Sequence, residues 1–179
     1  MMKKYLIIIT GLFLFCSAFG QTPIEVTPEM QRKIKLNIEK DAINLKKQLE
    51  KANENEVVVE FRIDTFKIER FMEEYIKLDF STAGMRESGY HAASAYDTLL
   101  NKYYKKLLAI LKGDDKKILI QAQKAWITFR DSETKLVEVI SKDEYSGGGT
   151  MQQLTESSMY LDLIKNRLSE IFSHFTRAT

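Results

Sequence analysis

The sequence predicts an all-α protein, an up-and-down helical bundle of three long helices plus two N-terminal helices. Two observations carry this prediction. The only prolines, Pro23 and Pro28, precede nearly all of the expected helices, so no helix breaker interrupts the rest of the chain. The glycines gather at a few positions, and the long stretches between them carry apolar residues every three or four positions. That spacing is typical of amphipathic helices.

The first 20 residues are predicted to be a signal peptide that is removed on export. Lys3 and Lys4 precede an apolar run at 6–15, and residues 17–20 offer a small-x-small cleavage site. The run is about half as long as the ~20 residues that a bilayer span requires, so no permanent membrane span is expected. The sequence therefore predicts an exported protein, either periplasmic or secreted.

Composition excludes several classes of function. The 27 basic residues lose Lys3 and Lys4 with the signal, which leaves 25 against 25 acidic residues and a formally neutral chain. A neutral chain of evenly mixed charge has no electrostatic footprint for nucleic acid. The only cysteine, Cys16, lies in the signal, and the only histidines are His91 and His174. We therefore expect no metal site, no cofactor and no thiolate chemistry.

Residues 21–80 are predicted to form an N-terminal helical extension packed on the bundle. Thr27, Pro28 and Glu29 give an N-cap, a proline in the first turn and an acidic side chain near the positive end of the helix dipole. An apolar stripe at spacings of three and four follows to about residue 52.

The segment 57–63 is ambiguous between strand and helix. Its β-branched residues and its alternation favour a strand, but no partner strand is visible elsewhere. We interpret it as extended chain or as a helix lead-in. Asp64 and Thr65 are then predicted to start the second helix, which ends near Leu78.

Residues 81–179 are predicted to form the bundle domain. Long helices are expected at about 85–112, 114–142 and 150–175, separated by a glycine turn and by a loop at 143–149. Because short connections make sequential helices antiparallel neighbours, the first long helix should pack against the second.

Two stripes of polar and aromatic residues are expected to meet across that hairpin. Folding the helices back without offset places Asp97 level with Arg130, and Asn101 level with Trp126. A second fold-back brings the last long helix to the height of Trp126. The predicted network comprises Asp97, Asn101, Tyr104, Gln123, Trp126, Arg130, Asp131 and Arg167.

This network has two interpretations. In the first, it is structural and fixes helix register through an Asp97–Arg130 ion pair and an Asn101–Gln123 hydrogen bond, with Trp126 filling the core. In the second, a polar groove around Trp126 binds a small ligand, as in a ligand-binding or envelope-stress bundle. No nucleophile and base accompany the stripes, so the sequence predicts no enzymatic activity.

The loop before the last long helix is a candidate recognition site. No strand precedes its glycines and no Lys-Ser or Lys-Thr follows them, so it does not match a phosphate-binding loop. Acidic and aromatic side chains on an exposed connection are typical of a binding surface. The candidate recognition loop comprises Asp143, Glu144, Tyr145, Gly147, Gly148 and Gly149.

The same residues carry a resemblance to a known family. They read D-x-x-L-N-x-x-Y from Asp97 and Q-x-x-W-x-x-F-R-D from Gln123, followed by glycines at 147–149 and by Arg167. This pattern, over about residues 81–172, is similar to that of the lysozyme inhibitor LprI-like family of small secreted or lipid-anchored bacterial helical proteins. The resemblance implies a non-enzymatic cell-envelope protein that inhibits lysozyme or a related glycan hydrolase.

The resemblance also suggests how such an inhibitor would act. Lysozyme is cationic and has a long cleft, so Asp143 and Glu144 would supply complementary charge and Tyr145 an aromatic anchor. Relatives often carry cysteines in these helices, and without them the bundle depends on packing alone. The corresponding positions in this chain are Ser88, Thr134 and Met159.

Overall fold

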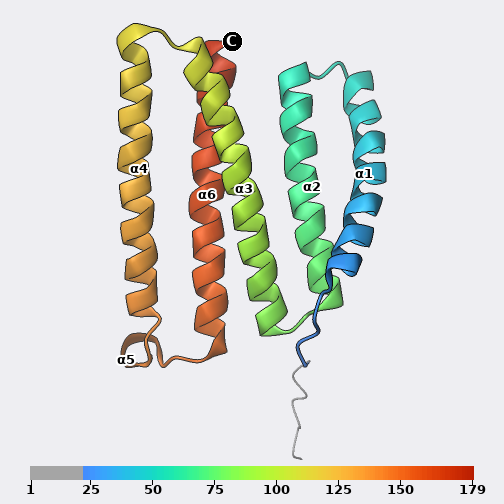
Figure 1. The fold of residues 1–179 in the computed structure, drawn as a ribbon, viewed down its shortest axis with the longest axis vertical. Helices are drawn as coiled ribbons and strands as arrows, with labels where there is room; N and C mark the ends of the chain where they lie inside the picture. The colour runs from blue at the N-terminus through green and yellow to red at the C-terminus, as the bar shows by residue number, and fades with distance from the viewer. Residues whose placement is uncertain (1–21) are drawn as a thin grey trace, which may run out of the picture.

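The structure, a computed structural model, describes residues 22–179 and confirms the all-α class (Figure 1). The predicted signal peptide, residues 1–20, lies outside the described residues. None of the helices in the described range combines the length and the apolar composition that a bilayer crossing demands. The helices are α1 (Pro28–Lys51), α2 (Glu56–Leu78), α3 (Thr82–Ile110), α4 (Gly113–Ile140), α5 (Asp143–Ser146) and α6 (Thr150–Ala178).

The interpretation of segment 57–63 as extended chain or a lead-in is wrong, because the segment is helical. Helix α2 begins at Glu56, and the Asn55 side chain caps it by accepting a hydrogen bond from the Val57 N–H at 2.9 Å. Val57 and Phe61, four residues apart, both pack against the hydrophobic core. In a helix, the backbone N–H and C=O groups of this segment bond to one another, whereas a lone strand would leave them without partners. This gain in hydrogen bonding outweighs the β propensity of the three valines.

The helices stand side by side in the order α1, α2, α3, α6, α4, and successive long helices alternate in direction (Figure 1). Helix α3 packs most extensively on α6, which runs parallel to it, and α4 lies against the other side of α6. The expectation that α3 would pack chiefly on α4 is therefore wrong. The reason is local: the face that α3 buries carries Gly89, Ala92 and Ala93, whose small side chains let α6 approach closely.

Helices α3 and α6 approach each other closely at Gly89. A Cβ atom built on Gly89 would lie 3.1 Å from the Ser157 Oγ and 3.5 Å from the Ser157 Cβ. Ser88 and Ser157 are fully buried nearby, and both hydroxyls are satisfied. Ser88 Oγ donates to the Met72 carbonyl at 3.1 Å, and Ser157 Oγ donates to the Leu154 carbonyl at 2.9 Å.

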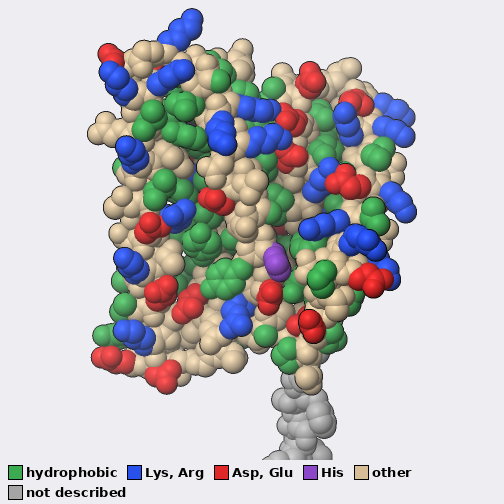
Figure 2. Space-filling model, viewed as in Figure 1, with side chains coloured by type: hydrophobic (Ala, Val, Ile, Leu, Met, Phe, Trp, Pro, Cys, Tyr) green, Lys and Arg blue, Asp and Glu red, His purple; other side chains and the backbone are tan. Residues whose placement is uncertain are grey.

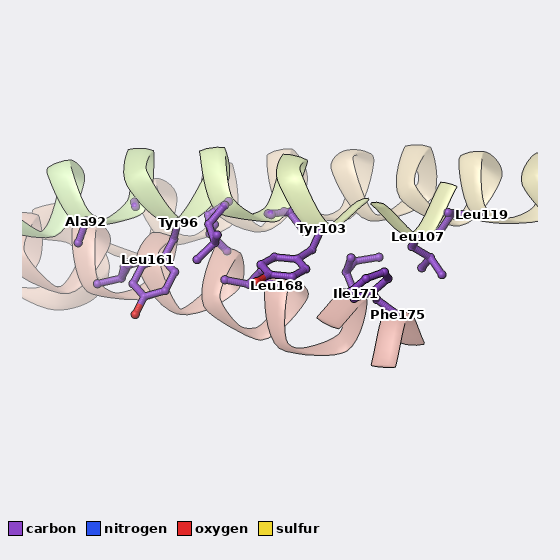
Figure 3. Packing of buried hydrophobic residues seen from close by; sticks show 13 residues of the cluster. Ala92, Tyr96, Tyr103, Leu107, Leu119, Leu161, Leu168, Ile171 and Phe175 are labelled. Carbon is purple, nitrogen blue, oxygen red and sulfur yellow. The ribbon is translucent and has the colours of Figure 1, made fainter. Parts of the chain in front are cut away.

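The core lies where α2, α3 and α6 meet. Tyr103 of α3 points toward Leu168 and Ile171 of α6 (Figure 3). Phe61 of α2 stacks on Phe172 of α6 with ring centroids 3.8 Å apart. The edge of the Tyr103 ring meets both of these rings, at centroid distances of 5.4 and 5.1 Å. Aromatic rings from α2 and α6 therefore pack around one fully buried tyrosine of α3.

Charged side chains tie the same three helices together at the edge of the core. Glu69 of α2 accepts a hydrogen bond from Lys165 of α6 at 2.6 Å and another from the Tyr96 hydroxyl of α3. Burial alone would raise the pKa of Glu69, but the bonds from Lys165 and Tyr96 hold it below its usual value.

Asp79 is buried at the junction of α2 and α3. Its Oδ1 accepts a hydrogen bond from the Ser81 N–H at 3.0 Å. Burial alone would raise the pKa of Asp79, but hydrogen bonds from Ser81 and from the backbone of Ile24 hold it below its usual value. This carboxylate therefore anchors the segment before α1 to the start of the bundle.

Candidate functional site

The polar network forms between α4 and α6, with Arg167 of α6 at its centre. Arg167 Nε donates to the Gln123 Oε1 of α4 at 3.0 Å, and Arg167 Nη1 donates to Glu170 at 2.8 Å. The guanidinium carbon lies 5.8 Å from the centroid of the Trp126 ring. The Arg167 side chain is only 11% exposed, and Gln123 is buried. The expected closeness of Arg167 to Trp126 is confirmed.

Trp126 lies within range of a second guanidinium. The Arg130 guanidinium carbon is 5.4 Å from the indole centroid, a distance typical of a cation–π contact. Arg130 also donates two hydrogen bonds to the exposed Asp131, at 2.9 and 2.6 Å. The indole packs partly buried against the core, so it links α4 to the bundle.

Neither polar bond expected between α3 and α4 is present in the range 22–179. Asp97 and Arg130 form no ion pair, and Asn101 does not bond to Gln123. Instead, Asn101 Nδ2 donates to the Oδ2 and carbonyl oxygen of Asp97, at 3.1 and 2.9 Å, within one turn of α3. Tyr104 is half-buried against the core and makes no hydrogen bond to α4. These differences follow from the helix order, because the polar stripe of α4 faces α6.

The loop between α4 and α6 contains a helical turn that the sequence analysis missed. Helix α5 occupies Asp143–Ser146, and three consecutive glycines follow with φ angles of 74°, 67° and 90°. Glycine adopts this left-handed region without the steric cost that other residues incur. A glycine shortly after two acidic residues, as at Asp143, Glu144 and Gly147, is the sequence signal that could have revealed the turn.

The loop is held by its own hydrogen bonds. The Ser146 hydroxyl donates to the Ser141 carbonyl at 2.9 Å and accepts from the Gly148 N–H at 3.1 Å. A Cβ atom on Gly148 would clash with the carboxylate of Asp143, which would have to move, and the positive φ of Gly148 also favours glycine there. Tyr145 is 58% exposed at the tip. The loop therefore presents an aromatic side chain from a fixed backbone.

A groove between α4 and α6, which the sequence analysis also missed, opens near the loop. We call it the α4–α6 groove; its volume is about 490 Å³, and Tyr90 of α3 closes one side. It is lined by residues 129–138 of α4 and 156–166 of α6, including Thr134 and Met159. Finding it from sequence would have required knowing that α4 contacts α6 rather than α3.

Charge is distributed unevenly over this side of the neutral chain. Lys and Arg side chains gather at the upper left of Figure 2, where α3 ends and α4 begins, and carboxylates at the lower left, near α5. Asp143 and Glu144 are exposed at that lower end. Across residues 22–179, no three His, Asp or Glu side chains lie close enough together to hold a metal ion.

The fold and these surfaces define a class, an all-α bundle that presents a fixed loop and a groove at one end. A family model described as lysozyme inhibitor LprI matches residues 79–171, which are 93 of the 179 residues. The chain belongs to this family. The match begins at the buried Asp79 and includes the whole α4–α6 network and the loop, whereas α1 and α2 lie outside it. No curated protein and no solved structure matches the chain.

Proposed function

We propose that the protein is an exported, non-enzymatic inhibitor of lysozyme or of a related glycan hydrolase, acting in the periplasm or after secretion. The observation that carries this proposal is membership of the lysozyme inhibitor LprI family, with a match that spans the loop and the network. Export rests on the pattern of residues 1–20 in the sequence.

The loop has the chemistry that a cleft-blocking inhibitor needs. Tyr145 is a large aromatic side chain exposed on a backbone already held in place, so little ordering entropy would be lost on binding. Asp143 and Glu144 form no ion pair within the described residues and are available to a cationic enzyme. Although the chain is neutral overall, charges within a Debye length of about 8 Å of the contact decide its electrostatics.

The test is a titration of lysozyme with the chain that begins at Gln21, followed by the rate of cell-wall lysis. We expect inhibition near one molar equivalent. Tyr145→Ala should weaken it by about 30-fold, the equivalent of ~2 kcal/mol for an anchor residue. The double variant Asp143→Lys/Glu144→Lys should also weaken it, because both charges are reversed at the contact.

A matched control is the double variant Asp114→Lys/Asp115→Lys, which makes the same charge change at the opposite end of α4. It should inhibit like the unmodified chain. Unchanged lysis at about 100-fold excess of the unmodified chain would refute the proposal. Turnover of glycan by the chain alone would refute its non-enzymatic part.

The structure does not favour a small-ligand groove around Trp126. Such a groove required the α3 side chains Asp97 and Asn101 to face α4, whereas α3 packs chiefly on α6 and the two side chains bond to each other.

A further inference from the structure

The α4–α6 groove leaves large apolar side chains uncovered. Phe129 of α4 is 54% exposed and Met159 of α6 is 42% exposed, and both line the groove. Val137 of α4 and Leu163 of α6 line it as well. Hydrophobic side chains are visible along this side of the molecule (Figure 2). An apolar recess of this size between two helices is typical of a binding groove.

The rim of the groove carries one sign of charge. Glu133 and Glu138 come from α4, Glu156 and Asp162 come from α6, and no lysine or arginine lines the groove. None of the four carboxylates forms an ion pair or a side-chain hydrogen bond within the part of the chain that is described. By contrast, Glu69 on the α2 side of the bundle is paired with a lysine. Carboxylates therefore stand unpaired on both walls of an apolar recess.

This arrangement selects a ligand with an apolar face flanked by cations. The two α4 carboxylates are five residues apart and the two α6 carboxylates six, so each pair spans roughly 8–9 Å along its helix. That length corresponds to about one and a half turns of a bound helix, within reach of lysines placed on both sides of its apolar stripe. A second copy of this groove would instead bring like charges together.

We propose that the α4–α6 groove binds a short cationic amphipathic helix, with its apolar face on Phe129, Val137 and Met159 and its lysines on the rim carboxylates. Helices of this kind occur as membrane-active peptides. The site is separate from the loop proposed to meet lysozyme, so the chain would have a second activity, the capture of such peptides.

The probe is a fluorescent peptide of about 14 residues that contains only leucine and lysine in helical amphipathic order. The binding of this peptide to the protein chain that begins at Gln21 is measured by fluorescence anisotropy at about 0.15 M salt. We expect micromolar affinity. Glu133→Gln/Glu138→Gln and, separately, Phe129→Ala should each weaken binding by about tenfold or more. The control Glu25→Gln/Asp115→Asn removes two negative charges elsewhere and should leave binding unchanged.

Two further probes test the chemistry of the ligand. A leucine–glutamate peptide of the same pattern should not bind, and a lysine–serine peptide of equal charge should bind at least about tenfold more weakly. Thermal melts by circular dichroism establish that each variant is folded. Tyr145→Ala changes no charge and should keep peptide binding while weakening lysozyme inhibition, so failure of either proposal is distinguishable from failure of the other.

Three results would overturn the peptide assignment. The first is equal affinity of the unmodified chain and the folded groove variants. The second is binding of the lysine–serine peptide as tightly as the leucine–lysine one. The third is sedimentation of the chain as a dimer that Phe129→Ala dissociates, since the groove would then be covered by a second copy.

Discussion

Replacing Tyr103 by alanine is expected to lower the free energy of unfolding by about 3–5 kcal/mol, while replacement by phenylalanine leaves it unchanged or raises it by up to ~1 kcal/mol. The ring is fully buried among Phe61, Phe172 and Phe175, so truncation leaves a cavity at the junction of three helices. The hydroxyl is buried without a hydrogen-bond partner in the described residues. Phenylalanine keeps the packing and removes the unpaired group.

The pKa of Tyr103 agrees with this view of its hydroxyl. Burial raises the pKa of the Tyr103 hydroxyl most, and the negative charges of Glu60 and Asp64 raise this pKa further. The phenol therefore remains protonated. A matched control is Tyr96, whose hydroxyl does have a partner, Glu69. Tyr96→Phe should therefore destabilise, by about 1–3 kcal/mol. Urea melts of the variants check these values, and a loss for Tyr103→Phe as large as that for Tyr96→Phe would contradict the packing described.

Arg167→Ala is expected to cost about 2–4 kcal/mol, because it leaves the buried Gln123 oxygen without its donor and uncovers one face of Trp126. Trp126 is the only tryptophan in the sequence, so its emission should shift to longer wavelength as water reaches the ring. Arg167→Lys should not restore stability, because a point charge cannot reproduce both the Nε bond and the stacked guanidinium.

The control for Arg167 is Arg130, which is more exposed (20% against 11%), contacts the same indole and pairs with the exposed Asp131. Arg130→Ala should cost about 1 kcal/mol or less. Urea melts followed by both circular dichroism and tryptophan fluorescence measure the two effects. If Arg130→Ala proved the more damaging change, the assignment of Arg167 as the centre of the α4–α6 interface would be wrong.

Much of the fold could be predicted because its signals are local. The Thr27 cap is confirmed, since its hydroxyl accepts the Met30 N–H at 3.3 Å. Segment 57–63 could not be assigned, because its composition fits a strand locally and only the packing of α2 on α3 and α6 decides for helix. The neighbours of α3 could not be deduced from loop lengths either, because small residues such as Gly89 favour α6 more than a short turn favours α4.

The candidate site could be predicted only where it depends on a connection that folds back as expected. The chain does fold back between α4 and α6, which are antiparallel neighbours, and this brings Arg167 close to Trp126. The Asp97–Arg130 pair depended on α3 and α4 facing each other, and that condition fails. The groove depends on how α4 lies against α6, a tertiary property that no spacing in the sequence encodes. Family membership agrees with the resemblance inferred from the motifs.

The parallel pairing of α3 with α6 sets the order of the helices and leaves α4 to pack on the other side of α6. In a chain beginning at Gln21, which has no native cysteine, Gly89→Cys and Ser157→Cys would place their Cβ atoms about 3.5 Å apart, within the range of a disulfide. Mild oxidation, read by non-reducing gel and mass spectrometry, should link this pair and leave the pair Asp97→Cys/Arg130→Cys as free thiols. The opposite pattern, with a bond between positions 97 and 130 and none between 89 and 157, would contradict this pairing.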